Sequence, residues 1–212
     1  MYAPPNPLRG LPQDSAFLHQ FLTQNAALHG QPIVLVGHSY GGAVITNAAV
    51  GDPEVRALVY VDAFIPDEGD TIGKLAMEQP GSCLGGNPAD VFNLVPYPGA
   101  PSGDVDLYIK PNLVPGCFAT GLPASQAAVI ATTQRPLTAS AFAEPSGPPA
   151  WKTIPSWAVI GTADQVIPPA ELTLMAKRAG ARITDVNAGH LSLISEPSVV
   201  TRVIRQAVHA TG

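Results

Sequence analysis

The sequence is poor in charged residues and contains no long apolar run. Only 13% of its 212 residues are charged, where about a quarter is usual in soluble domains. The formal net charge of −5 argues against nucleic acid or an anionic membrane surface as a partner. No apolar run approaches the roughly 18 residues of a membrane-spanning helix. These absences leave a globular domain that is long enough to bury a core as the expected class.

The sequence also contains few cysteines, and its N-terminal residues do not resemble an export signal. The N-terminal residues have neither the basic start nor the apolar stretch of a signal peptide, which favours a cytoplasmic protein. Cys83 and Cys117 are the two cysteines, and neither belongs to a metal-binding or CxxC pattern, so we expect no metal and no cofactor. Both follow Pro/Gly loops and are either buried thiols or a disulfide. We predict that they lie close enough to pair, and a bridge would indicate secretion of a protein whose N-terminus is incomplete.

Strand and helix patterns alternate along both ends of the chain. The length suits a single domain over 1–212, and the alternation predicts an α/β fold with a parallel sheet. A Pro/Gly-rich segment, 66–149, interrupts the pattern, and only 124–133 is clearly helical within it. We interpret this segment as a lid inserted above the C-terminal ends of the strands, where open α/β sheets bind ligands. The expected elements are helices over 15–28, 42–50, 169–179 and 197–210 and strands over 33–36, 56–62, 156–160 and 182–186.

The most informative motif is Gly37-His38-Ser39-Tyr40-Gly41. It follows an apolar strand and opens a helix, which is the arrangement of the nucleophile elbow in serine hydrolases. The sharp turn lifts the Ser39 hydroxyl out of the sheet, and the amide of Tyr40 at the helix N-terminus can stabilise an oxyanion. We expect Gly37 and Gly41 to be required because side chains there would collide with the neighbouring strand or helix.

A serine hydroxyl needs a base to accept its proton. Of the five histidines, His190 is the best candidate, because it follows a predicted strand; the side chain of His38 should point away from the Ser39 hydroxyl. Asp164, just past another strand, is the expected acid that orients the base. Asp62 and Asp67, after the strand that follows the elbow, are the alternatives for that acid. The chain order Ser39, Asp164, His190 is the order used by α/β-hydrolases.

Four segments together resemble the α/β-hydrolase superfamily, in particular small bacterial esterase-like members that are similar to plant hydroxynitrile lyases. The resemblance implies a serine hydrolase that cleaves a carboxylic ester or a similar small acyl compound through an acyl-enzyme. It leaves open a lyase that uses the same triad as a base, which a lysine near the site (Lys110 or Lys152) would favour, and a non-catalytic member. The matching segments are Gly37-His38-Ser39-Tyr40-Gly41-Gly42, residues 58–66, Gly161-Thr162-Ala163-Asp164 with Ile167-Pro168-Pro169, and Gly189-His190.

The front of the chain departs from this family. Members begin with a strand that ends in a His-Gly loop, and that loop supplies a second oxyanion donor; no such strand precedes the helix predicted over 15–28. We therefore expect an N-terminally truncated fold in which the Tyr40 amide is the one remaining donor and the strand 33–36 lies at or near a sheet edge. Since loss of one donor typically costs about 10²–10³ in turnover, we predict a poor catalyst or a poorly soluble chain.

Overall fold

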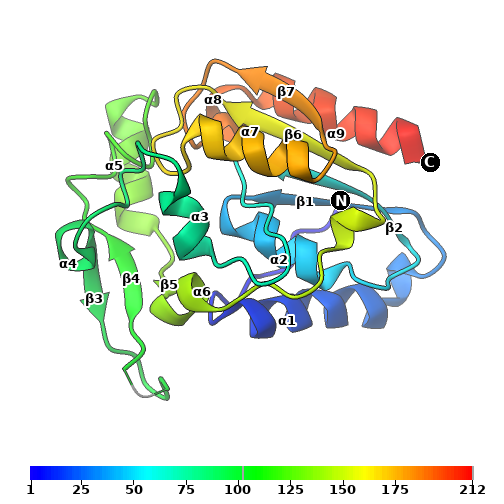
Figure 1. Ribbon diagram of the computed structural model, residues 1–212, viewed down its shortest axis with the longest axis horizontal. Coiled ribbons are helices and arrows are strands. Elements are labelled where there is room, and N and C mark those ends of the chain that lie inside the picture. The colour runs from blue at the N-terminus through cyan, green and yellow to red at the C-terminus, as the bar shows by residue number, and fades with distance from the viewer. Residues whose placement is uncertain (102, 212) are drawn as a thin grey trace.

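A parallel four-stranded sheet forms the centre of the molecule (Figure 1). The computed structural model describes residues 1–101 and 103–211. The strands are β1 (Ile33–His38), β2 (Val55–Val61), β6 (Ser156–Gly161) and β7 (Arg182–Val186), in the order β1-β2-β6-β7. All three neighbouring pairs are parallel. The central strands β2 and β6 are almost wholly buried apolar runs, as expected where helices cover both faces of a sheet. The predicted α/β fold is confirmed.

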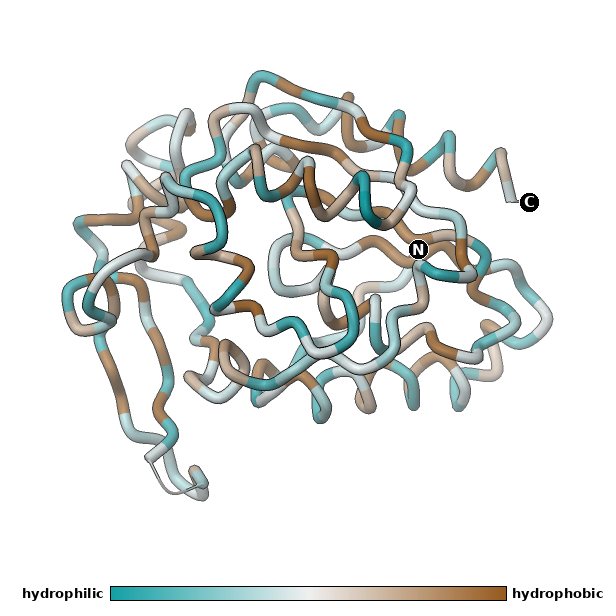
Figure 2. Tube along the Cα trace, in the orientation of Figure 1, coloured by the Kyte–Doolittle hydropathy of each residue, from teal (hydrophilic) through white to brown (hydrophobic). Residues whose placement is uncertain are grey.

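Helices cover the two faces of this sheet and bury two separate apolar clusters. On one face α9 (Pro197–Thr211) packs Val203 and Ala207 against Val59 of β2. On the other face, Val44 and Met175 belong to the same buried cluster as alternate residues of β2 and β6. Figure 2 shows the apolar residues concentrated in the strands between these helix layers. The helices of this second face are α1 (Leu11–Gln24), α2 (Tyr40–Ala48) and α7 (Pro169–Arg178), and the short elements are η1 (Ala26–Leu28), η2 (Ala150–Lys152) and α8 (Ser192–Ser195).

The segment 66–149 is more regular than its sequence predicted. It holds the expected helix, α5 (Ala124–Thr133), but also a three-stranded antiparallel sheet in the order β3-β4-β5. In Figure 1 this small sheet lies beside one end of the central sheet, with α5 above it. We call residues 66–149 the insertion. Its remaining elements are α3 (Ile72–Glu78), α4 (Pro88–Val91), β3 (Phe92–Val95), β4 (Asp106–Ile109), β5 (Leu137–Thr138) and α6 (Ala139–Ala143).

The first helix begins earlier than predicted, at Leu11 instead of residue 15. Pro12 lies in its first turn, a position where the missing N–H of proline costs nothing. Asp14, in the first turn of this helix, is buried and accepts a hydrogen bond from the Tyr40 hydroxyl at 2.7 Å. This bond ties α1 to the first turn of α2. Burial and the neighbouring carboxylate of Asp14 raise the pKa of Tyr40, so its hydroxyl stays a donor.

Strand β1 lies at the edge of the sheet, as the sequence predicted. Among residues 1–101 and 103–211 it pairs with β2 and with no second strand. Val36, in the middle of β1, is 44% exposed. The strand that leads into the elbow therefore has a sheet neighbour on one side only. In the same described part of the chain, no helix is both long and apolar enough to cross a membrane.

Candidate active site

Ser39 occupies a strained turn between β1 and α2. Its backbone has φ 54° and ψ −124°, a conformation that non-glycine residues seldom adopt. Two backbone hydrogen bonds hold it there: the Ser39 amide donates to the Val61 carbonyl at 3.3 Å, and the Phe64 amide donates to the Ser39 carbonyl at 3.2 Å. Tyr40 is the first residue of α2, so its amide belongs to the unpaired N–H groups of a helix N-terminus.

The glycines of the elbow have unequal roles. A Cβ on Gly37 would lie 2.5 Å from the Gly41 carbonyl oxygen, and one on Gly42 would lie 2.3 Å from the Phe64 carbonyl oxygen. A Cβ on Gly41 would enter open space. The expectation for Gly37 is confirmed and that for Gly41 is wrong: the close approach of helix α2 to the chain after β2 is made at Gly42.

A continuous chain of hydrogen bonds joins Ser39, His190 and Asp164. Asp164 follows β6 and His190 follows β7, so the parallel strands deliver both side chains to the same edge of the sheet as Ser39. The Ser39 Oγ lies 2.9 Å from His190 Nε2, and His190 Nδ1 lies 2.8 Å from Asp164 Oδ2. His190 is 0% exposed and Asp164 is 1% exposed. The structure thus brings together the three residues that the sequence singled out.

The contacts of Asp164 define the proton positions in this chain. Its second oxygen, Oδ1, accepts the amides of Val166 at 2.7 Å and Ile167 at 3.0 Å. Because several donors converge on the carboxylate, it acts as an acceptor and His190 Nδ1 carries the proton. His190 Nε2 is then free to accept the hydroxyl proton of Ser39, which is the arrangement a general base requires.

The alternative acids lie elsewhere. Asp62, just past β2, accepts hydrogen bonds from the Gly161 amide and from Ser192, and its burial raises its pKa to about 6. Asp67 forms an ion pair with Lys152 at 2.8 Å, and the pKa of Asp67 is lowered by this lysine. Of the three candidates, Asp164 is the one hydrogen-bonded to the imidazole of His190.

His38 forms a hydrogen bond to the backbone of His190. Its Nε2 lies 2.8 Å from the His190 carbonyl oxygen, so this nitrogen carries a proton and donates it. Burial lowers the pKa of His38 to about 3, with a further contribution from His190. His38 is therefore neutral at physiological pH, and its ring lies beside that of His190, with the ring centroids 4.8 Å apart.

A cavity of about 320 Å³ opens over Ser39 between the central sheet and the insertion. Its wall is mostly apolar and includes four phenylalanines, while His38, Ser39, Tyr40 and Gln134 line it as uncharged polar residues. Arg135 is the one charged lining residue, and its guanidinium donates to the Asn6 carbonyl at 2.7 Å. The apolar lining residues are Leu8, Phe64, Ile72, Leu84, Phe92, Leu107, Ile109, Val114, Phe118, Ile130, Leu137, Phe142 and Val166.

The two lysines considered for lyase chemistry do not line this cavity. Lys110 donates to the Ala89 carbonyl at 2.6 Å. Lys152 pairs with Asp67 and lies over the ring of Trp151. Neither position supports a role beside Ser39.

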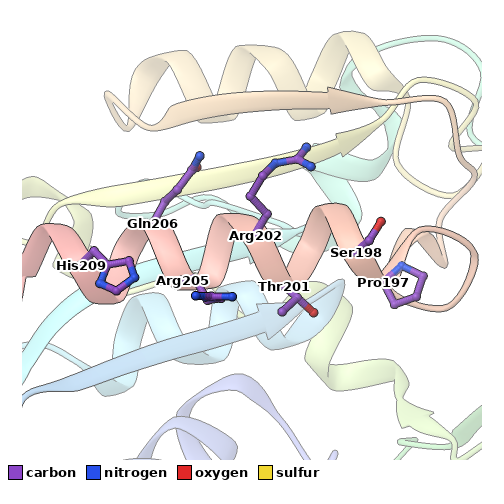
Figure 3. Close-up of a pocket in the computed structure, with 7 residues that line it drawn as sticks. All are labelled: Pro197, Ser198, Thr201, Arg202, Arg205, Gln206 and His209. Atoms are coloured by element: carbon purple, nitrogen blue, oxygen red, sulfur yellow. The ribbon is translucent and has the colours of Figure 1, made fainter.

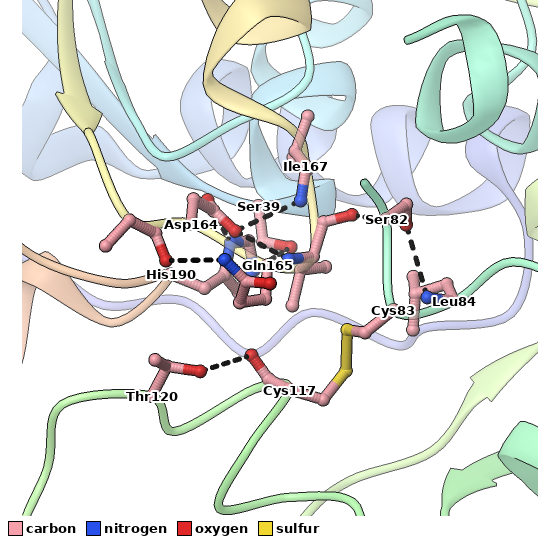
Figure 4. The surroundings of a disulfide bond; sticks show 12 residues. Ser39, Ser82, Cys83, Leu84, Cys117, Thr120, Asp164, Gln165, Ile167 and His190 are labelled. Carbon is pink, nitrogen blue, oxygen red and sulfur yellow. Dashed lines mark hydrogen bonds and ion pairs between the residues drawn. A yellow bond between two sulfur atoms is a disulfide. The ribbon is translucent and has the colours of Figure 1, made fainter. Parts of the chain in front are cut away.

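A disulfide joins Cys83 to Cys117 beside the site (Figure 4), with the Cα atoms 5.7 Å apart. The predicted proximity of the two cysteines is confirmed. The Cys83 amide donates to the Gln165 carbonyl at 2.7 Å, next to Asp164. On the other side of the bridge, Phe118 follows Cys117 and lies on the cavity wall. The disulfide therefore links the segment that is hydrogen-bonded to the Asp164 loop with the segment whose Phe118 contacts His190.

A more open hollow of about 510 Å³ runs along the outer face of α9 (Figure 3). Arg202, Arg205 and His209 line it together with polar side chains, and no member of the Ser39 hydrogen-bond chain lies there. Within the residues that the structure describes, no group of three or more His, Cys, Asp or Glu side chains is arranged to hold a metal ion.

Several residues of the site were missed by sequence reasoning. Phe118 and Ser192 lie in segments whose sequence shows no recognisable motif, and they reach the site through contacts over long chain separations. A signal for Gly42 was present, because the motif continues as Gly41-Gly42, but the pattern does not say which of the two meets a neighbour.

The fold and the elbow agree with a known protein family. The model of the alpha/beta hydrolase family matches residues 2–203, and the chain belongs to this family. Among solved structures, a methylesterase from Arabidopsis superposes with a TM-score of 0.73 at 17% identity, covering 96% of this chain and 80% of that protein. A pyrethroid hydrolase from Sphingobium faniae superposes with a TM-score of 0.64 at 21% identity, covering 93% and 78%. At these identities the structural likeness concerns the fold.

One curated relative matches a shorter stretch more closely. A carbendazim-hydrolysing esterase of Nocardioides sp. (strain SG-4G) is 56% identical over 41 residues. The match covers 19% of this chain and 17% of that relative. Its activity therefore bears on this chain only as support for a proposal.

Proposed function

We propose that this protein is a serine esterase that hydrolyses small, uncharged carboxylic esters with a bulky apolar group. The observation that carries the proposal is the unbroken hydrogen-bond chain from Asp164 through His190 to the Ser39 hydroxyl, at the floor of an apolar cavity. Family membership and the relatives described as esterases point in the same direction.

In the proposed reaction, Ser39 Oγ attacks the ester carbonyl carbon while its proton passes to His190 Nε2. The tetrahedral intermediate collapses, the bond to the leaving oxygen breaks, and His190 returns the proton to that oxygen as the alcohol departs. Water then attacks the acyl-enzyme with His190 again as base, which releases the acid and restores the Ser39 hydroxyl. Asp164 holds the imidazole in place and stabilises its positive charge during both steps.

The Tyr40 amide is the proposed oxyanion donor. It is the first N–H of α2, directly after the nucleophile, and the positive end of the helix dipole favours the developing negative charge. Leu8 also lines the cavity and its backbone adopts φ 62°, but its amide donates to Asn6 Oδ1 at 3.3 Å. Tyr40 therefore supplies the donor that our mechanism uses.

We further propose that the insertion acts as the lid and selects the substrate. Aromatic and aliphatic side chains from β3, β4 and α5 form the cavity wall opposite Ser39. Burial of an apolar group against this wall contributes about 25 cal/mol per Å² removed from water. A charged group would lose its hydration there, and the charged lining residue Arg135 is exposed and donates to the Asn6 carbonyl instead of being buried in the cavity. The cavity thus favours esters with a neutral aromatic or branched aliphatic group.

The test is hydrolysis of a series of p-nitrophenyl esters, together with labelling by a fluorophosphonate probe. We expect turnover of neutral esters, labelling at Ser39, and loss of both in Ser39→Ala. Asp164→Asn should lower kcat by about 10⁴, as loss of this charge does in other triads. Ser198→Ala, at an exposed serine of α9, is the matched control and should behave as the wild type. Labelling that persists in Ser39→Ala would contradict the proposal.

A further inference from the structure

Asp62 is a buried carboxylate that the mechanism above does not use. It is the first residue after β2, it is 0% exposed, and its backbone lies in the left-handed region with φ 44°. Among the residues that the structure describes, no lysine or arginine forms an ion pair with it; it accepts hydrogen bonds from two backbone amides and one hydroxyl. A carboxylate in such a place is costly to bury without compensation, and the strained backbone adds to the cost. The free-energy cost of burying Asp62 must be offset by the contacts that its carboxylate makes.

The partners of Asp62 come from the two segments that carry the base and the acid. Its Oδ1 accepts the Gly161 amide at 2.7 Å, and its Oδ2 accepts the Ser192 amide at 3.2 Å and the Ser192 hydroxyl. Ser192 lies two residues after His190. Gly161 ends β6, and its carbonyl accepts the Asp164 amide at 3.1 Å. A Cβ on Gly161 would lie 3.0 Å from Asp62 Oδ1 and 2.7 Å from the Gly189 carbonyl oxygen, so the contact depends on glycine there.

The backbone around Asp62 also holds the nucleophile. Val61, the preceding residue, accepts the Ser39 amide, and Phe64, two residues later, donates to the Ser39 carbonyl. Asp62 and its chain neighbours Val61 and Phe64 therefore contact the segments that carry Ser39, Asp164 and His190. The carboxylate of Asp62 itself makes no hydrogen bond to Ser39, His190 or Asp164; its partners are Gly161 and Ser192.

We propose that Asp62 is a positioning residue, which fixes the histidine loop through Ser192 so that His190 Nε2 stays within reach of the Ser39 hydroxyl. This inference rests on the proposed esterase function. A carboxylate suits the task because Ser192 offers two donors, which one carboxylate oxygen can accept together. An asparagine at this position could keep the bond from Gly161, but its NH₂ group would then face the N–H of Ser192. The loop would have to move to relieve that contact.

The test compares Asp62→Asn, Ser192→Ala and the double variant with the wild-type protein. The active fraction of each preparation is first titrated with a fluorophosphonate, and kcat and KM for a p-nitrophenyl ester are then expressed per active site. We expect kcat to fall about 10- to 100-fold in Asp62→Asn and about 3- to 10-fold in Ser192→Ala, each with KM within about twofold of wild type. Because both variants break one contact, the double variant should lose no more than Asp62→Asn alone.

Asp67→Asn is the matched control, because Asp67 lies in the same loop and its carboxylate pairs with Lys152 near the surface. It should leave kcat per active site unchanged. A purely structural role for Asp62 would lower the active fraction and the melting temperature but not kcat per active site, and that result would overturn the proposal. So would multiplicative losses in the double variant. If Asp62→Asn does not fold, Ser192→Ala decides, and a wild-type kcat there contradicts the proposal.

Failure of the underlying function has a different signature. If wild-type protein neither turns over esters nor reacts with the fluorophosphonate at Ser39, the esterase proposal is wrong. If the wild-type protein is active and the Asp62 and Ser192 variants have the same kcat per active site as the wild type, the esterase proposal stands and the positioning role is wrong.

Discussion

The ring of Phe118 packs edge-on against the imidazole of His190, with ring centroids 5.1 Å apart and planes at 64°. Phe118 also lies on the cavity wall and follows a disulfide-bonded cysteine. Phe118 thus connects the insertion to the imidazole of His190.

Truncation of this contact should impair ester hydrolysis. In Phe118→Ala the imidazole loses an aromatic neighbour worth about 0.5–1.5 kcal/mol beyond area burial, and the cavity gains space beside the base. We expect kcat/KM for an aromatic ester to fall about tenfold, measured under initial-rate conditions. Phe17→Ala, at an exposed phenylalanine of α1, should have no effect. Equal kcat/KM in Phe118→Ala and wild type would contradict the prediction.

The disulfide should stabilise the fold measurably. Cys83 and Cys117 are separated by 34 residues in the sequence, and closing a loop of this size removes roughly 3–4 kcal/mol of chain entropy from the unfolded state. We expect reduction to lower the unfolding free energy by about that amount in urea titrations. The control is the double variant Cys83→Ala/Cys117→Ala. Its unfolding free energy should equal that of the reduced wild-type protein and should not change when the reductant is added. An unchanged midpoint on reduction of wild type would exclude a stabilising bridge.

Acid should destabilise the protein through His38. The folded-state pKa of His38 lies near 3, below the ordinary value of 6.5, so between these pH values the unfolded chain binds more protons than the folded one. Stability is therefore fully present above about pH 6.5 and is lost as the pH falls towards 3. His38→Gln can keep the bond to the His190 carbonyl without titrating.

Between about pH 7 and pH 4.5, the unfolding free energy should fall by about 2 kcal/mol less in His38→Gln than in wild type. Urea titrations at the two pH values measure this difference. His209→Gln, at an exposed histidine of α9, should show the wild-type pH dependence. Parallel pH curves for His38→Gln and wild type would show that His38 is not the responsible group.

The two adjacent glycines of α2 should respond oppositely to alanine. A Cβ at Gly42 meets the Phe64 carbonyl oxygen and the Ala63 Cβ, so Gly42→Ala should cost about 1–3 kcal/mol as the helix is pushed away. A Cβ at Gly41 meets nothing within 4 Å, so Gly41→Ala should be neutral or stabilise the helix by up to about 1 kcal/mol. Thermal unfolding of the two variants checks this order, and a reversed order would contradict the packing described here.

The central sheet and the meeting of Ser39, Asp164 and His190 could be predicted because their signals are local. A continuous apolar strand followed by Gly-x-Ser-x-Gly indicates both an element and a candidate nucleophile, and the parallel arrangement then places Asp164 and His190 at the same edge. The insertion could not be predicted in this way. Its strands β3 and β4 have four residues each and half-exposed side chains such as Leu94, so they depend on partners distant in the chain.

The errors at single residues have the same origin. The open space at Gly41 and the crowding at Gly42 depend on where the chain after β2 crosses helix α2. The helix predicted from residue 15 begins at Leu11, and Asp14 in its first turn is held by the Tyr40 hydroxyl from another helix. Capping and turn preferences describe the neighbourhood of a residue in sequence, whereas these outcomes are set by a tertiary contact.

The edge position of β1 divides its amides into two sets. The Ile33 amide donates to the Glu54 carbonyl at one end of the strand, and the Ser39 amide donates to the Val61 carbonyl at the other. In a parallel ladder the amides of alternate residues face the same neighbour, so those of Val34 and Val36 face away from β2. Hydrogen–deuterium exchange should therefore separate along β1 into slow and fast alternate positions, and the rate at the slow positions would report how often the strand beneath the nucleophile opens.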